Sequence, residues 1–212
     1  MVAVKRTFLV YALVLLAIVG VGHSAVAHGQ TDYSHAVRFV DHYTYTSSTG
    51  RVYLYSIFQN ASPETLDVYA SVKVFNAAGQ IVGAKSNDER AVPPGEKTIM
   101  QFYFDEPFTT VEYNVEAEES WYTPVIQNLA FESHTALKKE IVSVINHGHE
   151  PARYVKVHCL FFSGDEVVYY NSRYFTDRHN EIKPGKEITQ ELSCPHPYDS
   201  IMLILTGRGS AR

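Results

Sequence analysis

The clearest pattern along the chain is an alternation of apolar and polar residues that occurs twice. It is found in DVYASVKVFNAAGQIV at 67–82 and again in YVKVHCLFFSGDEVV at 154–168. A period of two places alternate side chains on opposite faces of a β-strand. In both stretches a glycine then precedes a second apolar run, as in a strand, a turn and another strand. The pattern therefore predicts two copies of one β-rich unit.

The two copies stay aligned further along the chain. VPPGEK at 92–97 aligns with IKPGKE at 182–187, and the register then continues without a gap. Upstream, Asn60 aligns with Asn146, and each ends an apolar stretch and precedes a polar turn that contains proline. Pro-Gly pairs mark tight turns. Because order, spacing and alternation all agree, we expect a duplicated domain in which each copy has its own core.

Short apolar stretches separated by glycine and proline turns indicate strands, and no helix is expected after the N-terminal segment. The predicted fold class is all-β, with two tandem immunoglobulin-like antiparallel β-sandwich domains after an N-terminal signal peptide. We place the domains at 31–119 and 124–208. The short linker between them contains Trp121 and Tyr122, so we expect the domains to be packed together rather than freely jointed.

The first residues have the pattern of a secretory signal peptide. Lys5 and Arg6 are followed by an uncharged run from Thr7 to Gly22 and then by Ala25-Val26-Ala27. A basic start, an apolar run and an A-x-A site predict a signal peptide at 1–27, cleaved after its last residue. The alternative is an uncleaved anchor, which would attach the protein to the membrane, although the run is shorter than the roughly 20 residues that span a bilayer. We expect an extracytoplasmic protein that is secreted, periplasmic or on the cell surface.

Composition adds two constraints. The 212 residues are 45% hydrophobic and 19% charged, which is typical of globular proteins, and the formal net charge is −5. Lysine and arginine are scattered along the chain, so nucleic acid is not an expected partner. Fifteen tyrosines and eleven phenylalanines lie among valines and threonines, a mixture that favours strands.

The sequence resembles the FxLYD domain, a small bacterial extracytoplasmic Ig-like module. VKVFN at 72–76 and CLFFS at 159–163 lie at the motif position, and both follow its order of apolar, any, apolar, aromatic and polar residues. Neither copy keeps the motif's phenylalanine, leucine, tyrosine or aspartate literally. Asn60, Asn146 and the two Pro-Gly turns match the family's other features. The resemblance implies an Ig-like fold and an extracytoplasmic location, and it implies no catalytic residues.

Both cysteines, Cys159 and Cys194, lie in the second copy. Cys159 takes the position of Val72 in the first copy and Cys194 that of Phe104, so both side chains should point into one core. In an oxidising compartment an even number of cysteines predicts a disulfide. The alternative is two separate buried thiols that pack like small apolar residues.

Four tyrosines form a candidate binding face. HYTYTSSTGRVYLYSIF at 42–58 reads as a hairpin, and Leu54 and Phe58 are expected to face the core. The tyrosines would then face outward and could bind a sugar polymer or a protein. The alternative is cross-strand pairing that only stabilises the hairpin. The four residues are Tyr43, Tyr45, Tyr53 and Tyr55.

Histidines provide a second candidate site. His147 and His149 lie in one turn, and His158 should lie on the outward face of the next strand. If the three converge they could bind zinc or copper, and the alternative is a solvated turn.

Motifs of known enzyme classes are missing from the sequence. We therefore expect a non-catalytic binding or structural module without a cofactor, whose partner is a protein or polysaccharide of the cell envelope. The alternative is a periplasmic protein that binds a metal or small ligand through the histidines of the second copy.

Overall fold

The computed structural model describes residues 31–212, which form β-strands and two short 3-10 helices. The predicted signal peptide at 1–27 lies outside the described residues. The first half contains η1 (Ser34–Ala36), β1 (Val37–Thr46), β2 (Val52–Asn60), β3 (Leu66–Phe75), β4 (Ile81–Val92), β5 (Lys97–Phe104) and β6 (Thr110–Glu119). The second contains η2 (Ile126–Asn128), β7 (Leu129–Ala136), β8 (Lys139–Asn146), β9 (Ala152–Ser163), β10 (Glu166–Tyr174), β11 (Glu181–Ile182), β12 (Glu187–Ser193) and β13 (Ser200–Arg208). Neither helix within 31–212 could span a lipid bilayer.

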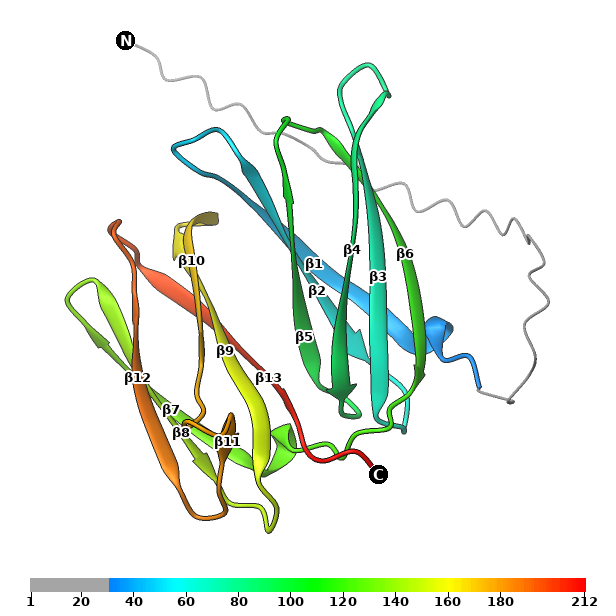
Figure 1. Cartoon of the computed structure of the whole chain (residues 1–212). Helices are drawn as coiled ribbons and strands as arrows, with labels where there is room; N and C mark the ends of the chain where they lie inside the picture. Colours follow the sequence, from blue (N-terminus) through cyan, green and yellow to red (C-terminus); the bar gives the residue numbers. More distant parts are fainter. Residues whose placement is uncertain (1–30) are drawn as a thin grey trace.

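Both halves of the chain build the same sandwich. In the first, which we call domain 1, the sheets have the orders β1-β2-β5 and β4-β3-β6. In the second, domain 2, the orders are β7-β8-β12 and β10-β9-β13, with β11 also pairing with β9. Every strand pairing is antiparallel. The predicted fold class of two tandem Ig-like β-sandwiches is confirmed for the described residues (Figure 1).

The alternating residues of the sequence pattern form the two cores. On β3, Val68 and Val72 are each 1% exposed, and on β9 Val155 and Val157 are fully buried. Each set packs against the inner face of the opposite sheet of its own domain. Burial of a side chain of this size stabilises the fold by roughly 1.5–3 kcal/mol before conformational entropy is counted.

Asn60 and Asn146 tie together the loops at equivalent ends of the two domains. Both are 1% exposed, and each ends the central strand of its sheet. The backbone carbonyl of Asn60 accepts a hydrogen bond from Gly95 at 2.8 Å, and that of Asn146 accepts one from Gly185 at 2.7 Å. The side-chain amides donate at 2.7–2.9 Å to carbonyls of Glu64 and Val92 in domain 1, and of Glu150 and Ile182 in domain 2. The same buried network in both copies explains why asparagine aligns with asparagine.

The predicted disulfide between Cys159 and Cys194 is not formed in the structure. Both residues are free thiols, at most 1% exposed, within the domain 2 core. The Cys194 Sγ donates to the His196 carbonyl at 3.3 Å. The alignment placed both side chains in one core without fixing their separation, and a disulfide requires Cα atoms about 4.4–6.8 Å apart. Burial raises the pKa of both thiols, so they stay protonated at neutral pH.

The two domains pack face to face. The β1-β2-β5 sheet of domain 1 meets the β10-β9-β13 sheet of domain 2, and their facing side chains form a third apolar cluster. In Figure 1 β13 lies beside β4 and β5 of domain 1. The C-terminal segment also pairs with the linker, since the Thr123 amide donates to Ser210 at 3.0 Å and the Arg212 amide to Trp121 at 2.8 Å.

Candidate functional site

The predicted tyrosine face is a contact between the two domains. Tyr55 is 2% exposed, and its ring stacks on Tyr170 of β10 with 4.5 Å between centroids. Tyr43 contacts Phe162 edge to face at 5.1 Å. These side chains point away from the domain 1 core. Domain 2 covers Tyr55, so the prediction of an open binding face is wrong there, whereas Tyr43 is only partly covered. Tyr45 also contacts domain 2, with 6.3 Å between its ring centroid and that of Tyr169, and with Tyr43 it lines an open cleft. Tyr53 packs against the interdomain cluster and lines a second cavity.

A comparison of aligned positions in the two copies shows how the sequence of domain 1 favours this contact. Ile57 and Ile99 pair across β2 and β5 and point toward domain 2. Ser143 and Thr189 take their places on β8 and β12, where no further domain packs within the described chain. Apolar residues thus occupy the outer face of a sheet in the copy where that face is covered, as the hydrophobic effect requires.

The domain 2 side shows the same contrast. Leu160 is 1% exposed and Ile204 is 8% exposed, and both belong to the interdomain cluster. At the aligned positions on β3 and β6, domain 1 has Lys73 and Asn114, and both are exposed. The sequences of both copies therefore specify which faces meet, and the packing of the domains is a property of this chain.

A groove of 680 Å³ remains where the facing sheets separate. Strands β2, β4 and β5 form one wall, and β9, β10 and β13 form the other. Its volume lies within the range of about 300–1,000 Å³ that is usual for small-ligand sites. Five tyrosines line it, namely Tyr53, Tyr103, Tyr154, Tyr170 and Tyr174.

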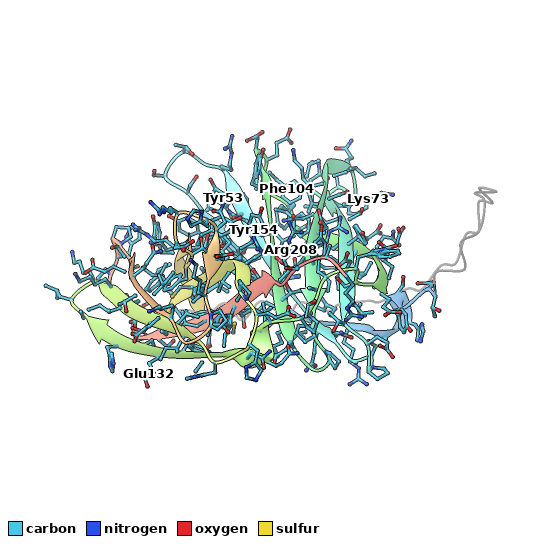
Figure 2. The ribbon with its side chains drawn as sticks, turned by 60° about the horizontal axis from the view of Figure 1, so that its bottom comes forward. Tyr53, Lys73, Phe104, Glu132, Tyr154 and Arg208 are labelled. Atoms are coloured by element: carbon cyan, nitrogen blue, oxygen red, sulfur yellow. The ribbon has the colours of Figure 1, made fainter. Side chains whose placement is uncertain are left out.

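Cations pack on the exposed tyrosine rings of this groove. The Lys156 Nζ lies 5.5 Å from the Tyr174 ring centroid. The Arg208 guanidinium lies 4.2 Å from the Tyr122 centroid and 4.8 Å from the Tyr154 centroid, and Figure 2 shows Tyr154 and Arg208 side by side between the domains. Such contacts fix the position of a cation without neutralising its charge, because the attraction comes from the ring quadrupole.

Lys156 and Arg208 differ from the other cations of the groove in having no acidic partner. Arg51 pairs with Asp105 at 3.1 Å, and Arg90 pairs with the buried Asp67 at 2.9 Å. Within the part of the chain that the structure describes, neither Lys156 nor Arg208 has a carboxylate within 4.0 Å. Two positive charges without an ion-pair partner therefore lie beside the tyrosine rings, and both act on the Glu89 carboxyl of the same groove.

The backbone around Arg208 is unusual at two positions. Tyr154 has a φ of 52°, although it lies within β9, and its amide donates to the Asn180 carbonyl at 3.0 Å. This conformation costs a residue with a side chain about 1–3 kcal/mol. At Gly207 an added Cβ would lie 3.1 Å from the Val155 Cα, so β13 approaches β9 closely only because this residue is glycine. Strained residues of this kind concentrate at functional sites.

Glu89 contributes a carboxyl group to the same groove. Burial raises its pKa to about 7, and attraction by Lys156 and Arg208 offsets only part of that effect. The Arg90 amide donates to its Oε1 at 3.3 Å. Burial therefore lets the Glu89 side chain hold a proton at a higher pH than an exposed carboxyl group would.

His158 lies in the wall of the groove instead of on an open face. It is 6% exposed, its Nδ1 lies 2.7 Å from the Tyr170 hydroxyl, and its Nε2 lies 3.2 Å from the Thr206 hydroxyl. Burial, together with repulsion from Lys156, lowers its pKa to about 3, so the imidazole is neutral. The sequence placed it on the outward face of β9 without showing that domain 2 meets domain 1 there.

The predicted metal site is wrong. His147 and His149 are exposed in the loop between β8 and β9, whereas His158 is buried at the domain interface. Among residues 31–212, no three side chains of histidine, cysteine, aspartate or glutamate come together in a way that could hold a metal ion.

A larger cleft of 1090 Å³ lies at the other end of the interface, between the β1–β2 hairpin and the β9–β10 hairpin. Its carboxylates are exposed: Asp165 lies in the turn of the β9–β10 hairpin and Glu166 begins β10. Unlike the tyrosine-lined groove, it brings no lysine or arginine against an aromatic ring. We therefore consider the smaller groove the candidate site.

The carboxyl groups that line the groove do not face each other across it. Asp88 and Glu89 are the carboxylic residues among those that line it. They are neighbours on β4, so their side chains point to opposite sides, and Asp88 is bound by Arg90 at 2.8 Å. Glycoside hydrolysis commonly requires two carboxyl groups that flank the scissile bond, about 5–10 Å apart. The lining residues do not provide that arrangement.

Known proteins add little to this interpretation. No family model matches the chain, and neither does any curated protein. Among solved structures, the crystal structure of red sea bream transglutaminase matches with a TM-score of 0.28 and 8% sequence identity. The match covers 81% of this chain and 29% of the transglutaminase chain, and a similarity this low carries no argument about activity. The resemblance to FxLYD domains stays a prediction.

Proposed function

We propose that this chain is a secreted or cell-envelope binding module without catalytic activity, built from two FxLYD-like domains, and that it binds a sugar polymer in the interdomain groove. The main support is the position of Arg208, which packs on Tyr122 and Tyr154 beside a concave, tyrosine-lined site and makes no ion pair within the described chain. The N-terminal sequence pattern supports export from the cytoplasm.

A sugar polymer suits the shape and chemistry of the groove. Tyr103, Tyr154 and Tyr174 line it and are 44%, 46% and 55% exposed. Aromatic faces are electron-rich, and the C–H groups on one side of a pyranose ring are a matching weakly positive, apolar surface. Tyrosine hydroxyls and cationic side chains can bind the sugar hydroxyls. A flat protein partner would need about 800 Å² of surface on each side, which a narrow concave groove does not offer.

The experiment is a binding screen on the chain from His28 to Arg212, using neutral and acidic hexasaccharides and thermal unfolding as the readout. A ligand that binds the folded state raises the unfolding temperature. We expect at least one hexasaccharide to do so, and we expect Tyr174→Ala to remove the effect. Lys73→Ala, on the far side of domain 1 in Figure 2, is the matched control. Absence of any shift, an unchanged shift in Tyr174→Ala, or cleavage of the sugar would contradict the proposal.

A further inference from the structure

We propose that the groove selects an acidic glycan, a polymer that contains uronic acids, and that Arg208 and Lys156 bind its carboxylate. This inference rests on the sugar-binding function proposed above and assigns the chemical class of the ligand. It follows from three features: the two cations without acidic partners, the aromatic surfaces beside them, and the small number of charges in the groove.

Arg208 has the chemistry and the placement to bind a carboxylate. Its guanidinium is held by two rings, at 4.2 and 4.8 Å, and it donates no side-chain hydrogen bond to any other residue that the structure describes. Guanidinium groups bind carboxylates through two parallel N–H···O bonds, so a positioned arginine with free donors favours a carboxylate over a hydroxyl. Because the rings already restrict the side chain, less conformational entropy is lost when a ligand binds.

Lys156 supplies a second charge in the same region. Its strand, β9, pairs with β13, and Lys156 lies opposite Thr206, two residues before Arg208. Both cations act on the Glu89 carboxyl, which shows that the three groups share one part of the groove. When Glu89 is protonated, the region has a positive charge with no anion to balance it. A single carboxylate of a ligand would provide that balance.

The surrounding residues favour a glycan over a nucleic acid. A single-stranded nucleic acid also uses aromatic rings and cations, but it carries a phosphate at every nucleotide and needs a positive groove along its path. Here Asp88 and Glu89 line the same groove, and the whole chain has a formal net charge of −5. Two unpaired cations between tyrosines fit one carboxylate flanked by the apolar faces of neighbouring sugar rings.

The decisive experiment compares uronate hexasaccharides with their carboxyl-reduced forms, in which each carboxylate becomes a hydroxymethyl group on an unchanged backbone. The panel contains galacturonate, mannuronate and glucuronate-containing hexasaccharides, and calorimetry on residues 28–212 measures the dissociation constants. We expect at least one acidic form to bind and its reduced form to bind about tenfold weaker or worse, as for loss of a charged hydrogen-bonded pair.

Variants then locate the carboxylate. Arg208→Ala and Lys156→Ala should each weaken binding of the acidic form about tenfold or more. The affinity of Arg208→Lys should lie between those of Arg208→Ala and the wild type, because lysine keeps the charge and loses the paired donors. Lys73→Ala removes an equal charge from the exposed face of β3 and should leave binding unchanged. Circular dichroism checks folding, and Lys156→Ala decides the result if Arg208→Ala does not fold, since the Lys156 side chain makes no ion pair in the described chain.

The outcomes separate this inference from the proposed function. If reduced hexasaccharides bind as tightly as acidic ones and Tyr174→Ala abolishes both, the sugar-binding groove stands and the acidic class is wrong. If no hexasaccharide binds, both proposals fail. If a single-stranded oligonucleotide binds more tightly than every uronate, or if Lys156→Ala and Lys73→Ala have equal effects, the inference is overturned.

Discussion

The Tyr55 ring of domain 1 stacks on the Tyr170 ring of domain 2, with 4.5 Å between centroids and 29° between planes. Tyr55 is almost completely buried, and Tyr170 also contacts His158 through its hydroxyl. Aromatic pairs of this kind contribute about 0.5–1.5 kcal/mol beyond the area that they bury. Because Tyr170 also lines the groove, the contact that joins the domains forms part of the wall of the proposed site.

Truncation of the interdomain stack should weaken the whole protein. Tyr55→Ala removes a buried aromatic side chain and leaves a cavity between the domains, so we expect the free energy of unfolding to fall by about 3 kcal/mol. Urea denaturation measures the change. Tyr174→Ala removes a tyrosine that is 55% exposed and should change stability by less than about 1 kcal/mol. Equal effects of the two variants would show that the domains do not pack through Tyr55.

The paired asparagines predict a stability loss in each domain separately. Asn60→Ala and Asn146→Ala leave buried carbonyl and amide groups without partners, and we expect each to lower the free energy of unfolding of its own domain by about 2–4 kcal/mol. Amide hydrogen exchange assigns the loss to domain 1 or domain 2. Asn114→Ala, on the exposed face of β6, is the control and should have little effect. If the buried variants were as mild as this control, the shared network would not hold the loops.

The thiols predict a distinct alkylation pattern. Cys159 and Cys194 are buried, and their raised pKa values leave almost no reactive thiolate. Iodoacetamide should therefore modify neither residue in the native protein. In denaturant it should modify both residues without any reductant. The intact mass of the protein measures the number of alkyl groups added. The variant Cys159→Val should stay folded, because Val72 fills the aligned position in domain 1. In denaturant this variant should take up one alkyl group. A need for reductant before alkylation would show that a disulfide forms in the exported protein.

Stability should depend on pH through groups with opposite effects, above all Glu89 and His158. The pKa of Glu89 in the folded state is about 7, above its ordinary 4.5, so the folded state holds a proton that the unfolded state loses. The free energy of unfolding therefore falls as pH rises from about 4.5 to 7, by roughly 1–2 kcal/mol after allowance for partial exposure. The pKa of His158 is about 3, below its ordinary 6.5, so its contribution is lost as pH falls from 6.5 toward 3.

Single variants separate these two contributions. In Glu89→Gln the free energy of unfolding should rise from pH 4.5 to 6.5 and then stay level to pH 8, because the contributions that remain come from His158 and His42, whose pKa values burial lowers. In His158→Gln the free energy of unfolding should fall more, or rise less, between pH 4.5 and 7 than in the wild type. Urea titrations at a series of pH values test both curves. Identical pH profiles for the wild type and Glu89→Gln would mean that Glu89 titrates normally.

The sequence was sufficient for the fold because alternation fixes both the strand and its face. Val68 and Val155 are buried as their period of two predicts, and the aligned Asn60 and Asn146 make the same hydrogen bonds. The site could not be predicted in the same way. Alternation places Lys156 on an outward face without showing that a second domain meets that face. Nothing local indicates the positive φ of Tyr154.

The sequence also contains a signal for the interface between the domains. Ile57 and Ile99 are apolar at outward positions where the second copy has Ser143 and Thr189. A comparison of outward positions between the copies would have identified the covered face. It would not have identified Arg208, because that residue reaches the groove through the close approach of β13 to β9 at Gly207.

Binding of an acidic glycan should weaken as pH rises through 7. Charged and titratable groups from every surrounding element share a cavity with Glu89. They are Arg51, Tyr53, Asp88, Arg90, Glu96, Lys97, Tyr103, Tyr154, Lys156, His158, Tyr170, Tyr174 and Arg208. The pKa of Glu89 is raised to about 7, whereas His158, with a pKa of about 3, is neutral above pH 4 and the pKa of Tyr170 is about 12. Ionised Glu89 repels the ligand carboxylate and competes for the same cations.

We therefore expect a uronate hexasaccharide to bind several-fold more tightly at pH 6 than at pH 8, with uptake of protons near pH 7 because the bound anion raises the Glu89 pKa further. Calorimetry in buffers of different ionisation enthalpy measures that uptake directly. Glu89→Gln removes the ionisable group and should bind with the same affinity at both pH values, whereas Glu132→Gln, on the exposed strand β7, should keep the wild-type dependence. A wild-type pH dependence that survives in Glu89→Gln would place the titrating group elsewhere and separate Glu89 from the ligand site.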